Sequence, residues 1–169
     1  MTTGQRNINE IIKYGILAGA AGALAEIAWV SLYAAVTGGD AAILARGVTT
    51  AAGVAALLPA APVTMGIVVH MTVAVVLGIA LVGLWQALAR THGTGSLYAV
   101  ALAALAGVWA LNFFVVLPAI SPAFVNLVPY PVSLLSKLLF GLAAAETLRR
   151  CAMGEAARVP VRVRVTRKP

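Results

Sequence analysis

The order of apolar and polar positions divides the chain into four long hydrophobic stretches. The first covers residues 15–36 and contains a single carboxylate, that of Glu26. At ~1.5 Å per residue, a helix of this length can cross a hydrocarbon core of ~30 Å. The other stretches cover residues 63–88, 96–117 and 132–148. The pattern therefore predicts four membrane-spanning helices.

The segments between these stretches predict the connections. Residues 37–40 (TGGD) and 90–95 (RTHGTG) are typical of tight polar turns. Residues 41–62 are less apolar, and we expect a helix that lies at the outer surface or dips partway into the membrane. Residues 118–131 contain four prolines, which predicts an apolar loop, folded over the outer mouth, rather than a regular helix. We therefore expect an all-α four-helix membrane bundle with short extra segments on its outer side.

One face of the first stretch consists of small residues and a carboxylate. Gly15, Gly19, Gly22 and Glu26 follow one another at i, i+4, i+7 and i+11, so they share a helical face. Small residues allow a neighbouring backbone to come close and mark helix–helix contacts in membranes. We therefore expect Glu26 to point into the protein.

Composition supports a membrane protein. Of the 169 residues, 62% are hydrophobic and 10% are charged, whereas soluble domains have roughly 25% charged residues. The single cysteine, Cys151, excludes an internal disulfide. The length fits one domain, for which we expect a transmembrane part over residues 1–150 and a disordered basic cytoplasmic tail over residues 151–169.

The net charge of +7 indicates orientation rather than nucleic-acid binding. With four spans, ten of the twelve Lys and Arg residues lie on the side of both termini, Arg46 lies opposite, and Lys137 lies within a span. This positive-inside pattern predicts a multi-pass inner-membrane protein with both termini in the cytoplasm. The expected partners are the bilayer, anionic lipid at the basic tail, and homo- or hetero-oligomers formed through small-residue faces. No aromatic interleaving supports a nucleic-acid partner.

Each predicted span carries one strongly polar side chain at a similar depth. These residues lie about six to ten positions from the outer ends, or roughly 9–15 Å below the outer surface. They are Glu26, His70, Asn112 and Lys137. Ionisable groups in hydrocarbon cost about 2.5–3.5 kcal/mol each on insertion scales, so they pair or face water. We expect Glu26 and Lys137 to neutralise each other and His70 to exchange a proton beside them.

Two interpretations of this polar layer remain open. The first is a small polar pocket that binds a ligand or relays protons on the outer side. The second is structural: a buried ion pair that fixes helix register, with His70 and Asn112 as hydrogen-bonding partners. A third possibility is that the faces of these helices are assigned wrongly.

Enzyme and cofactor chemistry is weakly supported. Zinc sites gather three or four Cys, His or carboxylate ligands, and this layer has one imidazole and one carboxylate beside a repelling lysine. No phosphate-binding glycine loop follows a strand, and no serine–histidine–acid spacing is present. We expect no catalytic residue, no metal and no cofactor. A membrane enzyme or metal site that uses Glu26 and His70 is the third functional alternative, after the polar site and an accessory subunit of a larger membrane complex.

Two stretches resemble known membrane proteins. Residues 66–84 (GIVVHMTVAVVLGIALVGL) and 134–148 (LLSKLLFGLAAAETL) resemble spans of small uncharacterised four-helix bacterial inner-membrane proteins. In these proteins a span with a histidine before a glycine recurs, often as an H-L-x-(Y/F)-G-like string. Lys137 stands here where the second histidine would be. The resemblance implies the architecture and no activity.

Overall fold

The computed structural model describes residues 8–92 and 97–158, and all regular elements within them are helical. Four helical segments are long and apolar enough to cross a membrane. They are α1 (Ile8–Thr37), α3 (Pro62–His92), α7 (Tyr130–Arg158) and a continuous run made of α4 (Leu97–Leu111), the π-helix η1 (Asn112–Val116) and α5 (Leu117–Ile120). Two short helices lie between them, α2 (Ala41–Ala51) and α6 (Pro122–Val125). The predicted all-α class with four candidate spans is confirmed for the described residues.

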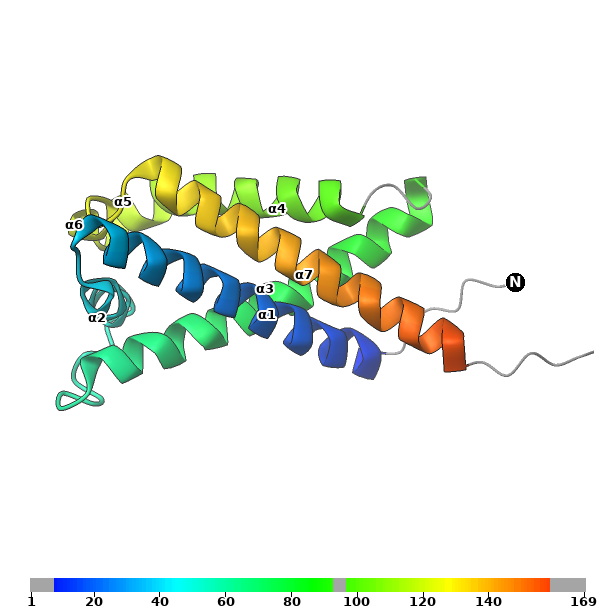
Figure 1. The fold of residues 1–169 in the computed structure, drawn as a ribbon, viewed down its shortest axis with the longest axis horizontal. Coiled ribbons are helices and arrows are strands. Elements are labelled where there is room, and N and C mark those ends of the chain that lie inside the picture. The colour runs from blue at the N-terminus through cyan, green and yellow to red at the C-terminus, as the bar shows by residue number, and fades with distance from the viewer. Residues whose placement is uncertain (1–7, 93–96, 159–169) are drawn as a thin grey trace, which may run out of the picture.

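The long helices pack in a row. α1 lies between α3 and α7, and α4 packs against α7 (Figure 1). α3 and α4 follow each other in the chain, yet they make few contacts with each other. The contacts thus run in the order α3, α1, α7, α4, and the predicted closure of the four spans into a bundle is not confirmed.

The glycine face of α1 sets the distance between α1 and α3. A Cβ atom on Gly78 of α3 would lie 2.5 Å from the backbone nitrogen of Gly19, and one on Gly15 would lie 2.5 Å from the Cα atom of Ile79. The two backbones are therefore in direct contact, as small residues allow between membrane helices. Gly22 faces α7 instead, where its missing side chain leaves room for the ring of Phe140. The prediction of a helix-packing face on α1 is confirmed.

The short segments gather at one end of the molecule, opposite the end at which α1 begins (Figure 1). Gly38 has φ of 72° at the turn after α1, a conformation that favours glycine. Asp40 then caps α2 by accepting a hydrogen bond of 2.8 Å from the Ala42 N–H, and Arg46 pairs with it at 2.9 Å. The Ala42 N–H and the Arg46 guanidinium together hold the pKa of Asp40 below its usual range. The predicted turn is confirmed, and the helix expected over residues 41–62 covers Ala41–Ala51 only.

α2 is fastened to the start of α3. The buried Thr49 hydroxyl donates to the Pro62 carbonyl at 2.6 Å, and Gly66 lets α3 approach the Ala45 carbonyl of α2. α2 has 11 residues and is about 16 Å long, which is too short to span a hydrocarbon core.

Three expected boundaries at the ends of the long helices were also wrong. The third span does not end before Pro118 but continues through it to Ile120. The π turn, in which the Leu117 N–H bonds to the Asn112 carbonyl, widens the helix just before the proline and accommodates a ring that would clash in a regular α-helix.

The other two boundaries concern helix length. α3 continues to His92 into the expected turn at residues 90–95, because Ala87, Leu88, Ala89 and Arg90 are good helix formers. α7 extends to Arg158, well past the predicted end at residue 148, because Ala, Glu, Met and Arg there favour a helix. The first part of the expected tail, residues 151–158, is therefore helical, and residues 159–169 lie outside the described residues.

Candidate polar site between α1, α3 and α7

Glu26 of α1 is the centre of a buried polar cluster. Its side chain is 5% exposed, and the Lys137 Nζ atom of α7 lies 2.7 Å from Oε1 and 2.9 Å from Oε2. One ammonium group thus contacts both carboxylate oxygens. The predictions that Glu26 points into the protein and that it pairs with Lys137 are confirmed.

Two further side chains contact the same carboxylate. The Ser136 hydroxyl lies 3.3 Å from Glu26 Oε1, and it is also 2.8 Å from the Ser133 carbonyl, so its single hydrogen serves one of these acceptors at a time. From α3, His70 places Nε2 at 3.6 Å from Glu26 Oε2, which is beyond hydrogen-bond distance. The structure therefore brings together Glu26, His70 and Lys137 from three helices.

The His70 ring has an unusual environment. Its Nε2 atom is buried and has no hydrogen-bond partner within the described part of the chain, although the side chain as a whole is 26% exposed. The imidazole also interacts with the backbone of Ala23, one turn before Glu26. Buried nitrogen atoms are seldom left unpaired, so this atom is the part of the cluster that most calls for a functional explanation.

The first turns of α7 are held by two tryptophans. The Trp29 indole of α1 donates to the Val132 carbonyl at 3.1 Å, and the Trp109 indole of α4 donates to the Ser133 hydroxyl at 3.0 Å. The Ser133 hydroxyl in turn donates to the Tyr130 carbonyl at 3.0 Å. Ser136 and Lys137 follow one turn later. The two indoles therefore fix the rotation of α7 that points these side chains toward Glu26.

Asn112 is not part of the contact cluster. It is half-buried at the start of η1, and within the described residues it makes no hydrogen bond to Glu26, His70 or Lys137. The helix order explains this position, because α7 lies between α4 and α1. At this end of α4 the hydrogen bond to α7 comes from Trp109 instead, and near the other end Tyr98 donates to Glu146. The role predicted for Asn112 stays a prediction.

The electrostatics of the cluster follow from its burial. Glu26 and Lys137 together carry no net charge, and the Lys137 ammonium also lies 5.8 Å from the centre of the Phe140 ring, a favourable cation–π distance. Ionised groups in an apolar environment are costly unless they are paired. A proton added to His70 would leave the three groups with a charge of +1, next to a carboxylate that attracts it.

Metal binding gains no geometric support from this cluster. Within the described residues, no three His, Cys, Asp or Glu side chains gather closely enough to hold an ion. Both Glu26 oxygens are also occupied by the Lys137 ammonium.

Ser136 is the member of the cluster that sequence reasoning missed. A serine in an apolar span needs a hydrogen-bond partner, and its position beside Lys137 was a usable signal.

Comparisons of the chain with protein-family models, with curated proteins and with solved structures gave no match.

Proposed function

We propose that this chain is a multi-pass membrane protein whose Glu26, His70 and Lys137 cluster takes up and releases a proton. The observation that carries the proposal is the buried His70 Nε2 atom, which has no hydrogen-bond partner among the described residues and lies 3.6 Å from a carboxylate oxygen of Glu26. The four candidate spans and the asymmetric Lys and Arg distribution support insertion in an inner membrane with both termini cytoplasmic.

The chemistry of the imidazole supports proton uptake. When its proton is on Nδ1, neutral His70 presents the Nε2 lone pair to Glu26 Oε2. In this state both facing atoms are hydrogen-bond acceptors, so no hydrogen bond forms between them. A proton on Nε2 turns His70 into a donor aimed at the carboxylate, and a shift of about half an ångström would complete the hydrogen bond. Histidine is also the side chain whose ordinary titration lies between pH 5 and 8.

The ion pair prepares the site for this proton. The Lys137 ammonium contacts both oxygens of Glu26 and fixes the position of the carboxylate. The Nε2 atom of His70 lies beside the same carboxylate. Two basic groups therefore share one carboxylate, and the weaker base, His70, exchanges the proton.

The position of the cluster favours proton exchange with the outer side of the membrane. His70 lies eight residues from the start of α3 and Lys137 seven residues from the start of α7, or about 12 and 10 Å along the helix axes. Both helices begin at the end of the molecule where α2 and α6 lie (Figure 1). In the proposed orientation this end is the outer one.

The test is direct observation of the His70 proton. The chain has two histidines, so protein labelled with ¹⁵N-histidine in lipid bilayers gives one signal set for His70 and one for His92. Between pH 5 and 8 we expect His70 Nε2 to change from an unprotonated to a protonated nitrogen, and Glu26→Gln to weaken this proton binding. In liposomes with an internal pH dye, we expect a proton flux that His70→Gln abolishes and the matched control His92→Gln retains.

Two results would overturn the proposal. One is a wild-type His70 that keeps a single protonation state throughout this pH range, a measurement that needs no variant to fold. The other is a proton flux that stays unchanged in a folded His70→Gln protein.

A further inference from the structure

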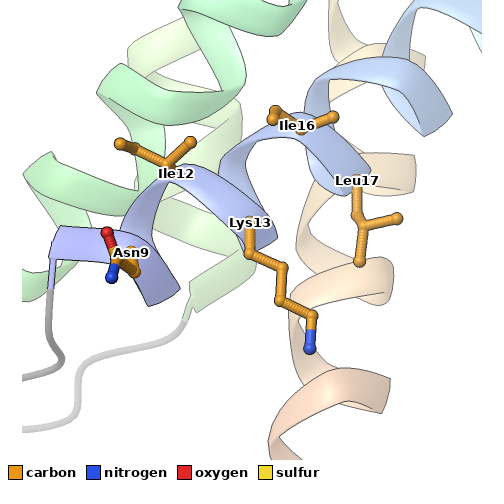
Figure 2. Close-up of a pocket in the computed structure, with 5 residues that line it drawn as sticks. All are labelled: Asn9, Ile12, Lys13, Ile16 and Leu17. Atoms are coloured by element: carbon orange, nitrogen blue, oxygen red, sulfur yellow. The ribbon is translucent and has the colours of Figure 1, made fainter.

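The cytoplasmic end of α1 carries a second polar feature, separate from the buried cluster. An open hollow of about 420 Å³ lies along the first turns of this helix. It is lined by Asn9, Ile12, Lys13, Ile16 and Leu17. Figure 2 shows Asn9, Lys13 and Leu17 in one row along the helix, with Ile12 and Ile16 in the neighbouring row. The hollow is thus mostly apolar, and its two polar side chains, Asn9 and Lys13, lie nearer the helix start.

Lys13 is the charged group of this hollow. It is exposed, its Nζ atom lies 5.5 Å from the centre of the Tyr14 ring, and it makes no ion pair among the residues that the structure describes. Glu10, one turn earlier, is not paired with it there. The ammonium is therefore available to an external anion, while the methylene stem and the Tyr14 ring keep it near the helix surface.

We propose that this hollow binds an anionic phospholipid of the cytoplasmic leaflet. Lys13 pairs with the headgroup phosphate, the Asn9 amide donates a hydrogen bond to the headgroup, and one acyl chain lies along Ile12, Ile16 and Leu17. The order of these residues matches that of a lipid, because about 12 Å of helix axis separates Asn9 from Leu17 in the direction of the membrane centre. The proposal uses the orientation given above and does not depend on proton uptake by His70.

The charge of the hollow favours an anionic headgroup over a zwitterionic one. A phosphatidylcholine headgroup brings its own ammonium, which Lys13 repels, whereas a phosphatidylglycerol headgroup carries a net negative charge. A basic residue near a membrane surface gains about 1 kcal/mol from anionic lipid. A protein helix on this face would bury the Lys13 ammonium beside apolar side chains, which is costly without a paired carboxylate.

The experiment uses native mass spectrometry of the full chain in mild detergent, with added phosphatidylglycerol or phosphatidylcholine. We expect retained lipid to favour phosphatidylglycerol, and Lys13→Gln to reduce this preference about five-fold. Lys13→Arg restores it. The matched control Arg46→Gln, at the opposite end of the molecule, leaves it unchanged. Phosphatidylglycerol with a photoreactive acyl chain is expected to cross-link wild-type protein within residues 9–17.

Each alternative outcome is decisive. Equal retention of the two lipids, or an unchanged preference in Lys13→Gln, overturns the proposal. A preference that disappears only when Arg162 and Arg164 are replaced with glutamine assigns lipid binding to the basic tail and also overturns it. Cross-links confined to other helices do the same, and this last measurement needs no substitution.

Discussion

Breaking the buried ion pair at Glu26 should destabilise the fold by more than the loss of an ordinary polar contact between membrane helices does. Glu26→Gln removes the negative charge and leaves the ammonium of Lys137, whose side chain is 17% exposed, beside a neutral amide. Loss of one partner of a buried ion pair costs about 3–5 kcal/mol in soluble proteins. Polar contacts between membrane helices average only about 0.6 kcal/mol, with a maximum near 1.7. Because Glu26 is buried and both of its oxygens bind the ammonium, we expect a loss of about 2–3 kcal/mol.

The reciprocal change should cost a similar amount. Lys137→Met keeps an unbranched side chain that is one atom shorter, and leaves the carboxylate with Ser136 and with His70 Nε2 at 3.6 Å. In the double variant Glu26→Gln with Lys137→Met, no unpaired charge remains. We therefore expect the double variant to be more stable than either single variant, with a coupling energy above about 1.5 kcal/mol.

The assay is reversible unfolding of the reconstituted protein in mixed micelles with increasing dodecyl sulfate, followed by tryptophan fluorescence. Trp29 and Trp109 lie beside the cluster and report on it. Thr147→Val is the control, because it removes a hydrogen bond within α7 two turns from Phe140 and should change stability by less than about 1 kcal/mol. If each single variant loses less than about 0.5 kcal/mol of stability and the double variant loses only the sum of the two, the view that these charges depend on each other is refuted.

Three further predictions concern other parts of the chain. Gly78→Ala places a Cβ atom 2.5 Å from the Gly19 nitrogen and should cost at least about 1–3 kcal/mol in the same unfolding assay, whereas Gly83→Ala, with open space around it, should be neutral. Thr49→Val removes the hydroxyl that binds the Pro62 carbonyl and should increase backbone hydrogen exchange in α2 without loss of the four long helices. The lowered pKa of Asp40 means that its cap stabilises α2 above pH of about 4 and loses this effect as the pH falls further; a carboxylate titration by NMR, absent in Asp40→Asn, checks this.

The sequence was sufficient to predict the features that repeat along a helix. Length and hydropathy located the four candidate spans, and the spacing of Gly15, Gly19 and Gly22 identified the packing face of α1. The same spacing placed Glu26 inside, and opposite charge alone identified Lys137 as its partner. These predictions succeeded because a carboxylate and an ammonium in apolar helices each need a counter-charge.

Features that depend on the third dimension were not predictable in this way. Depth along a helix suggested that Asn112 belongs with Glu26, but depth does not reveal that α7 lies between α4 and α1. Nor does a proline count reveal a π turn, which lets the third span continue past Pro118. Ser136 was missed because its neighbour Lys137 accounted for the charge of Glu26 and left no apparent need for a hydroxyl.

The glycine face of α1 explains why the cluster forms between three helices rather than two. Gly19 lets α3 approach until the backbones touch, and His70 lies two turns before the contact residue Gly78 on α3. Gly22 admits the Phe140 ring of α7, three residues after Lys137, so α7 also comes close. Glu26 is one turn farther along the same face, where the side chains of His70 from α3 and Lys137 from α7 reach it. A bulky residue at Gly22 should move α7 away and separate Lys137 from the carboxylate, even though no charged group has been changed.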